Sequence, residues 1–199
     1  MQSMFYECTA LTAFKSDLSS LTEAVDMFYN CTNLTSFEAD LSSLTNSERM
    51  FESCTALTSF KSDLSSLTEI GYMMFSGANL TTFEADLSNL TKKWDNRYTS
   101  DNPFGSTPSL TTFKSNLSSL TDGSYMFEDF SKLTTFDADL SSLTNGQSMF
   151  YNCTALSAFT SDLSSLTNGF DMFGKCANLT SFSSDLSSLT MGHQMFSDC

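Results

Sequence analysis

The chain has 199 residues, of which 23 are acidic and 9 basic, so its formal net charge is −14, and 40% of its residues are hydrophobic. This hydrophobic content suffices for one compact domain or a short repeat array, whereas the negative charge argues against binding to nucleic acids or insertion into anionic membranes. A single histidine, His193, and the lack of a glycine-rich phosphate loop argue against most classes of enzyme.

An internal repeat runs through almost the whole chain. The motif L-T-x-F recurs every 23 residues, except for one step of 30. Its leucines are Leu11, Leu34, Leu57, Leu80, Leu110, Leu133, Leu156 and Leu179. Self-similarity at such a period is typical of solenoids, in which each coil is stabilised by its neighbours. We therefore predict one solenoid array over residues 1–199, with about eight 23-residue repeats and a seven-residue insertion within 92–102.

Each repeat predicts three elements in chain order. The L-T-x-F segment, Leu11–Phe14 in the first coil, favours a short parallel strand with its leucine and phenylalanine turned inward. The Asp-Leu-Ser-Ser segment that follows favours a turn, because an Asp side chain can accept a hydrogen bond from a backbone amide two residues later. The apolar spacing of Met4, Phe5, Cys8 and Leu11 indicates a short helical or 3-10 turn.

Residues at the same phase of successive coils should form columns. The position after the strand phenylalanine alternates in sign along the stack, and we call this set the charge ladder. Its members are Lys15, Glu38, Lys61, Glu84, Lys114 and Asp137. Opposite charges on adjacent strands stabilise a sheet by about 0.2–1 kcal/mol per pair. The ladder therefore predicts ion pairs that fix the register, or alternatively a patterned docking surface.

A second column is acidic, and we call it the aspartate column. It consists of Asp17, Asp40, Asp63, Asp86, Asn116, Asp139, Asp162 and Asp185. We expect each side chain to accept a hydrogen bond from its own Ser-Ser turn, which Asn116 can do without charge. Calcium at Asp17, Asp40, Asp63 and Asp86 is the alternative, but calcium needs six to eight oxygen ligands and each coil supplies one carboxylate. No metal site and no cofactor are therefore predicted.

All six cysteines share a third column, with Gly77, Thr107 and Phe130 at the intervening positions. Cys8, Cys31 and Cys54 lie near one end of the array, and Cys153, Cys176 and Cys199 near the other. Parallel side chains in a column point alike rather than toward each other, and three cysteines per cluster cannot all pair. We expect small, buried, reduced thiols.

The insertion is the main departure from the repeat. It contains the only tryptophan and three of the nine basic residues. Trp, Tyr and Arg are enriched at binding hot spots, and insertions in repeats map to loops. Lys92, Lys93, Trp94, Arg97 and Tyr98 are therefore the predicted binding residues, and a loop packed against its own coil is the alternative.

The repeat unit L-T-S-F-x-x-D-L-S-S-L-T-x(4)-M-F-x-x-C-x-x-L resembles the BspA-like leucine-rich repeats of microbial surface proteins. The similarity covers the chain apart from the insertion, with placements such as Phe28, Cys31 and Leu34. The chain departs from the family after the strand, where Ala39-Asp40-Leu41 replaces an aliphatic-Pro step. The resemblance implies a leucine-rich-repeat solenoid with one short parallel strand per coil, located outside the cell or on its surface, although the chain shows no signal peptide.

The expected function is a non-enzymatic adhesion or interaction module whose partner is a protein or a glycan. The sequence shows no acid–base pair, no nucleophile with a histidine and no metal triad that would support catalysis. The chain starts and stops within ordinary repeats, whereas solenoids normally end in capping repeats. A structural protein that stacks head to tail with other copies of itself is therefore the alternative.

Overall fold

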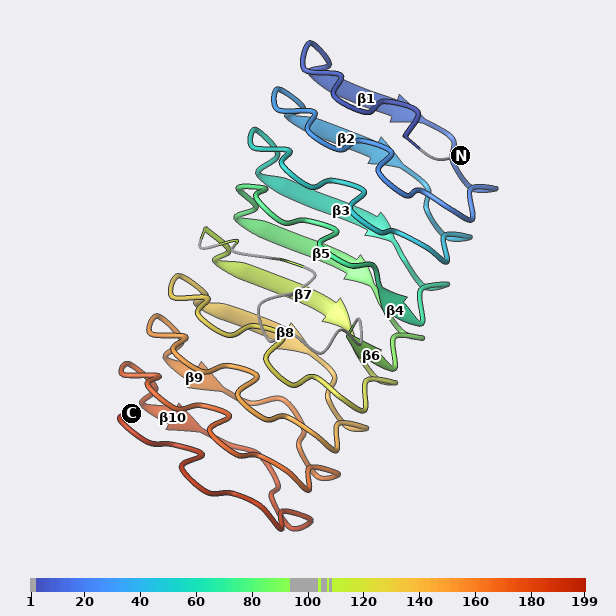
Figure 1. Ribbon diagram of the computed structural model, residues 1–199. Helices are drawn as coiled ribbons and strands as arrows, with labels where there is room; N and C mark the ends of the chain where they lie inside the picture. The colour runs from blue at the N-terminus through green and yellow to red at the C-terminus, as the bar shows by residue number, and fades with distance from the viewer. Residues whose placement is uncertain (1–2, 94–103, 105–106, 108) are drawn as a thin grey trace.

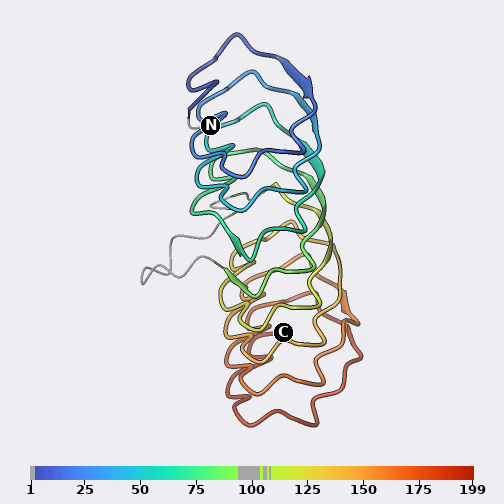
Figure 2. The ribbon, with the colours of Figure 1, turned by 90° about the vertical axis from the view of Figure 1, so that its right-hand side faces the viewer.

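The structure is a computed structural model that describes residues 3–93, 104, 107 and 109–199. It is a solenoid in which short parallel strands stack one above the next along the array (Figure 1), and the view turned by 90° shows the coils stacked along one axis (Figure 2). The strands of the main ladder are β1 (Ala13–Ser16), β2 (Ser36–Ala39), β3 (Ser59–Asp63), β5 (Thr82–Asp86), β7 (Thr112–Asn116), β8 (Thr135–Ala138), β9 (Ala158–Phe159) and β10 (Ser181–Phe182). They form three parallel sheets in line, β1–β2, β3–β5–β7–β8 and β9–β10, which we together call the main sheet. Equivalent residues pair in register, so that Phe60 of β3 lies beside Phe83 of β5 and Phe83 beside Phe113 of β7.

The strands begin later in the repeat than the sequence predicted. In the third coil the strand runs from Ser59 to Asp63, so that Leu57 precedes it. The backbone N–H of Leu57 is already bound to the carbonyl of Cys54 at 3.0 Å, which closes a turn instead of joining the ladder. Leu57 is nevertheless fully buried. The prediction that the leucine and phenylalanine face the core is confirmed, and the predicted position of the strand is wrong by about two residues.

A second, shorter ladder follows the Asp-Leu-Ser-Ser turns. It contains β4 (Glu69–Ile70) and β6 (Lys92–Lys93), which pair in parallel, and single bridges extend it from Lys92 to Asp122 and on to Asn145 and Asn168. Half-buried amide side chains support it, because Asn168 Nδ2 donates to Asn145 Oδ1 at 3.0 Å. In Figure 1, β4 and β6 lie beyond the ends of the main strands, so that each coil is held by two ladders.

The M-F-x-x-C segments form turns rather than the helical turns that the spacing predicted. The described residues contain no helix, and thus none long and apolar enough to span a membrane. Two residues in each of these turns adopt positive φ, such as Asp26 and Asn30 at 55°, and a helix cannot continue through this left-handed conformation. Alternate N–H groups bind the next coil instead, as Phe28 N does to Met50 O at 2.9 Å, whereas Tyr29 N binds Asp26 O within its own coil at 3.2 Å.

The core is built from two columns of phenylalanines that run along the solenoid axis. Within each column the rings stack, with centroids of Phe28 and Phe51 5.5 Å apart. Between the columns the rings meet edge to face, as Phe37 and Phe51 do at 4.8 Å. Both arrangements are favourable for aromatic rings. Phe104, which follows the insertion, is fully buried and continues its column between Phe75 and Phe127.

Side-chain hydrogen bonds to the backbone carbonyls of another coil share one direction, whereas Lys61 of the charge ladder donates to Glu84 of the following coil. The hydroxyl of Thr35 donates to the carbonyl of Thr12, Asn33 Nδ2 donates to that of Thr9, and Cys54 Sγ donates to that of Phe28. Thr111 and Thr134 repeat the pattern further along the stack. Wherever the described residues show a side chain donating to a carbonyl of another coil, the acceptor belongs to the preceding coil. Hydroxyl columns on the sheet thus bind the stack together.

Candidate functional site

The charge ladder lies on the outer face of the main sheet. Lys15 Nζ is 2.8 Å from Glu38 Oε2, and Lys61 Nζ is 2.7 Å from Glu84 Oε1. These side chains are mostly exposed, at 77% and 70% for the first pair, so that each pair stabilises the fold only weakly. The hydrogen bond and the charge of Lys61 lower the pKa of Glu84 from its ordinary value. Lys114 lies between Glu84 and Asp137 in the register of the sheet.

The aspartate column caps the turns that follow the strands. Asp63 Oδ1 accepts a hydrogen bond from Ser65 N at 2.8 Å, and Asp86 Oδ1 accepts one from Ser88 N at 2.9 Å. Asn116 Oδ1 makes the same contact with Ser118 N at 3.1 Å. In Asp17 and Asp139 the equivalent bonds lower the pKa of the carboxyl group. One oxygen of each side chain is thereby used within its own coil.

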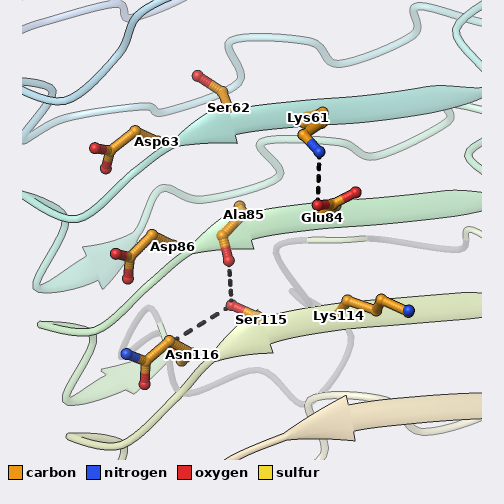
Figure 3. A pocket seen from close by; sticks show the side chains of 9 residues that line it. All are labelled: Lys61, Ser62, Asp63, Glu84, Ala85, Asp86, Lys114, Ser115 and Asn116. Atoms are coloured by element: carbon orange, nitrogen blue, oxygen red, sulfur yellow. Dashed lines mark hydrogen bonds and ion pairs between the residues drawn. The ribbon is translucent and has the colours of Figure 1, made fainter.

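An open hollow lies over β3, β5 and β7 (Figure 3), and we call it the strand-face hollow. Each strand contributes a ladder residue, a small residue and a residue of the aspartate column. The lining residues are Lys61, Ser62, Asp63, Glu84, Ala85, Asp86, Lys114, Ser115 and Asn116. The small residues alternate between Ser and Ala, and Ser115 Oγ donates to the carbonyl of Ala85 at 2.9 Å. A similar hollow lies over β1, β2 and β3.

The structure places only part of the predicted binding loop. Lys92 and Lys93 form β6, and Lys92 Nζ is 3.0 Å from Glu69 Oε1. Lys92 therefore takes part in the second ladder through both its backbone and its side chain. Trp94, Arg97 and Tyr98 lie outside the described residues.

No cluster of three or more His, Cys, Asp or Glu side chains in the described part of the chain has the arrangement of a metal site. Asp17, Asp40, Asp63 and Asp86, the alternative calcium ligands, each direct Oδ1 to the amide of the serine two residues later. They do not converge on a common point as the ligands of a calcium ion must.

The cysteines form a column whose four inner members are buried, whereas Cys8 is partly buried and Cys199 is exposed, so the prediction of a buried thiol is wrong for Cys199. Cys54 Sγ donates to Phe28 O at 3.2 Å and Cys176 Sγ to Phe150 O at 3.1 Å, while burial raises the pKa of both thiols to about 12. All six thiols are free. One predicted member of the column, Gly77, is wrong. In the cysteine column the backbone N–H of Cys54 donates to the carbonyl of the phenylalanine three residues earlier, and in the next coil Ala78 makes this bond, to Phe75 O. The segment 69–74 is one residue longer than the equivalent segment 46–50 of the preceding repeat, so the position equivalent to Cys54 moves from residue 77 to residue 78.

A charged cluster on the turns of the first coils was missed by the sequence analysis. Arg49 Nε is 2.8 Å from Asp26 Oδ1, and a second contact joins Arg49 Nη2 to Asp26 Oδ2 at 2.9 Å. Burial raises the pKa of the neighbouring Glu52. Asp26 and Arg49 share one phase of the repeat, so a column analysis of the residue before each M-F pair would have found the pair.

Comparison with known proteins identifies the repeat. A family model described as "BspA type Leucine rich repeat region (6 copies)" matches residues 1–97 and 86–199. A search of curated proteins found no match. The chain is also similar to the crystal structure of a leucine-rich repeat protein from Bacteroides ovatus, with 14% sequence identity and a TM-score of 0.43, over 96% of this chain and 77% of the other.

Proposed function

Because the chain belongs to the BspA-type leucine-rich-repeat family, we propose that it is a non-enzymatic adhesion module that binds a protein partner outside the cell or at its surface. Repeats of this family are generally interaction modules and are typically non-catalytic. The observation that carries the proposal is the outer face of the sheet, where exposed side chains of alternating charge form ion pairs, and three members of this charge ladder line the strand-face hollow.

The test is saturable binding of the labelled protein to intact cells and to surfaces coated with extracellular proteins. The key variant combines Lys61→Gln with Glu84→Gln, which leaves the net charge at −14 and removes one ion pair that contributes little to stability. We expect an unchanged melting temperature and a loss of binding of about tenfold or more. Binding that is not saturable, or that the variant retains in full, would contradict the proposal for this face.

The insertion is the second proposed contact region. Trp94→Ala with Tyr98→Ala removes the two aromatic side chains of the loop, and large aromatic side chains often dominate binding energy. In the same assay, this variant should bind more weakly with little change in melting temperature. Unchanged affinity would remove the loop from the binding surface.

Head-to-tail assembly is a second candidate function, favoured by one observation. Among the described residues, the large hydrophobic side chains that stay exposed lie in the two end coils: Met4, Tyr6, Met191 and Phe196. Stacked copies would cover these side chains. Light scattering coupled to size-exclusion chromatography, over a wide range of concentration and with reductant, should then show open oligomers that grow with concentration. A constant mass of 21.9 kDa would rule this function out.

A further inference from the structure

Lys114 on β7 differs in its ion pairing from the other two lysines of the charge ladder. Lys15 and Lys61 each form an ion pair with the glutamate of the next coil, whereas Lys114 has no ion pair within 4.0 Å in the described part of the chain. Its neighbour Glu84 is already bound to Lys61 at 2.7 Å. The ammonium group of Lys114, on an exposed side chain at the edge of the strand-face hollow, is therefore available to an acidic ligand group.

Asn116 adds a second free donor on the same strand. Its Oδ1 accepts the hydrogen bond that caps the turn, which is the bond that aspartate makes in the other coils. Its amide nitrogen carries two N–H donors for which the described residues provide no partner. Figure 3 shows Lys114 and Asn116 on either side of Ser115 along β7. Aspartate makes the same capping hydrogen bond at this position in other coils, so the amide group of Asn116 is not required for folding.

Carboxylates lie on the coils on both sides of the donors Lys114 and Asn116. Asp86 of β5 is the register partner of Asn116, and Asp137 of β8 is the register partner of Lys114. Asp139 follows in the turn after β8, where its side chain is exposed. Along the solenoid axis, β5, β7 and the segment at β8 thus present acceptors, then donors, then acceptors, at a spacing of about 4.8 Å per coil. The first two of these strands line the hollow, whereas the carboxylates at β8 lie just beyond its edge.

An extended peptide matches this order of charges. Alternate side chains of such a peptide lie about 6.6 Å apart on one face, and the long side chains of lysine and glutamate can absorb the difference from the coil spacing. The trough between residues 114 and 116, two positions apart on one strand, is also about 6.6 Å wide. A peptide backbone can lie along this trough over the small side chains of Ala85 and Ser115.

We propose that the strand-face hollow binds a peptide segment of the protein partner in which one acidic side chain lies between two basic side chains. The acidic side chain binds Lys114 and Asn116, and the basic side chains bind the carboxylates of the neighbouring coils. This inference rests on the proposed function and specifies the chemistry of the partner. Charge complementarity of this kind determines which partners are accepted and which are repelled.

Two synthetic peptides of identical composition test the proposal, both acetylated and amidated at their ends. One contains Lys-Gly-Glu-Gly-Lys in a Gly/Ser background and the other Lys-Gly-Lys-Gly-Glu. Titration calorimetry with the full chain at low salt should show binding of the first peptide about tenfold tighter than that of the second, because each 1.4 kcal/mol corresponds to tenfold. The preference should decrease at higher salt. Equal affinities, or no binding of either peptide, would overturn the proposal.

Asn116→Asp is the decisive variant, because it installs the residue that the equivalent coils already carry and should fold normally. It replaces the two donors by a repelling carboxylate, so binding of the first peptide should weaken about tenfold. Gln194→Glu, which adds the same single negative charge on an exposed turn away from the sheet, is the matched control and should leave affinity within about twofold. Unchanged or tighter binding of the first peptide by Asn116→Asp would refute the proposed hydrogen bond from Asn116 to the acidic side chain of the peptide. Cell binding without peptide binding would refute this inference and leave the proposed function intact.

Discussion

Single side chains in this protein are constrained mainly by what the neighbouring coil offers them. Thr107 occupies the cysteine column, where the Sγ of Cys153 donates to Phe127 O at 3.2 Å, but the buried hydroxyl of Thr107 has no partner among the residues that the structure describes. A buried donor without a partner costs about 1–3 kcal/mol. The column is therefore suited to a thiol, which is apolar enough to be buried and still a weak donor.

Replacement of Thr107 should accordingly stabilise the protein. Thr107→Cys is expected to raise the free energy of unfolding by about 1 kcal/mol, because a thiol at this phase reaches the carbonyl of the preceding coil. Thr107→Val, which removes the hydroxyl at nearly constant shape, should also stabilise. Urea unfolding at neutral pH with reductant measures both changes, and a clear loss of stability in the valine variant would show that the hydroxyl has a partner.

The ion pair between Lys61 and Glu84 predicts a small dependence of stability on pH. The pKa of Glu84 is lowered in the folded state, so its contribution is complete above the pKa of the unfolded chain and disappears as the pH falls through the folded pKa. The relevant window lies below about pH 4.5, the ordinary pKa of a glutamate. Thermal melts between pH 2 and 7 should show that Glu84→Gln reduces the loss of stability in this window. Parallel curves for both proteins would contradict the prediction.

At the scale of elements, the turn after each strand depends on one side-chain acceptor rather than on its charge. Asp63 and Asn116 make the same contact with a serine amide, although only Asp63 has a carboxyl group. Turns of this type are stabilised by the local hydrogen bond itself. The aspartate column is thus explained within each coil, without a bound cation.

The turn hypothesis is tested by two substitutions at one position. Asp63→Ala removes the acceptor and should lower the free energy of unfolding by about 1 kcal/mol. Asp63→Asn keeps the acceptor, as Asn116 does, and should be nearly neutral or slightly stabilising, because Asp86 lies beside Asp63 in the sheet. Denaturant unfolding compares the two variants. Equal losses in both would mean that the charge of Asp63, and not its hydrogen bond, stabilises the turn.

The repeat made most of the fold predictable, and the exceptions have physical causes. The period placed Phe60 beside Phe83 and Lys61 beside Glu84, because side chains at one phase must stack. The strand boundaries could not be predicted, since Leu57 uses its N–H in a turn. Apolar spacing in the M-F segments suggested a helix, but spacing does not reveal left-handed residues such as Asn30. The site was only partly predictable, because Lys114 keeps its donors free only if its neighbour Glu84 binds Lys61 instead, and the sequence does not show which lysine Glu84 binds.

The whole molecule is held together by contacts between adjacent coils, so its stability should vary along the axis. Phe83 is 1% exposed and its ring contacts those of Phe60, Phe75, Phe104 and Phe113. Phe182, in an end coil, is only partly buried. Local opening should therefore be easiest at the ends and hardest in the middle of the array.

Equivalent substitutions at the two positions measure this gradient. Phe83→Ala should destabilise the protein by about 3–5 kcal/mol, the usual cost of such a cavity, and Phe182→Ala by clearly less. Hydrogen exchange of the same variants should show that the second change raises exchange only in the coils next to it. Equal costs and uniform exchange would mean that the array unfolds as a single cooperative unit.

The common direction of the side-chain hydrogen bonds to backbone carbonyls has a consequence for synthesis on the ribosome. Thr35 donates to Thr12 and Cys54 to Phe28, so each donor leaves the exit tunnel after its acceptor has already emerged. A newly translated coil can dock at once on the coil translated just before it, and it need not await distant segments. The molecule is thus suited to vectorial folding, growing from its N-terminus at the pace of translation.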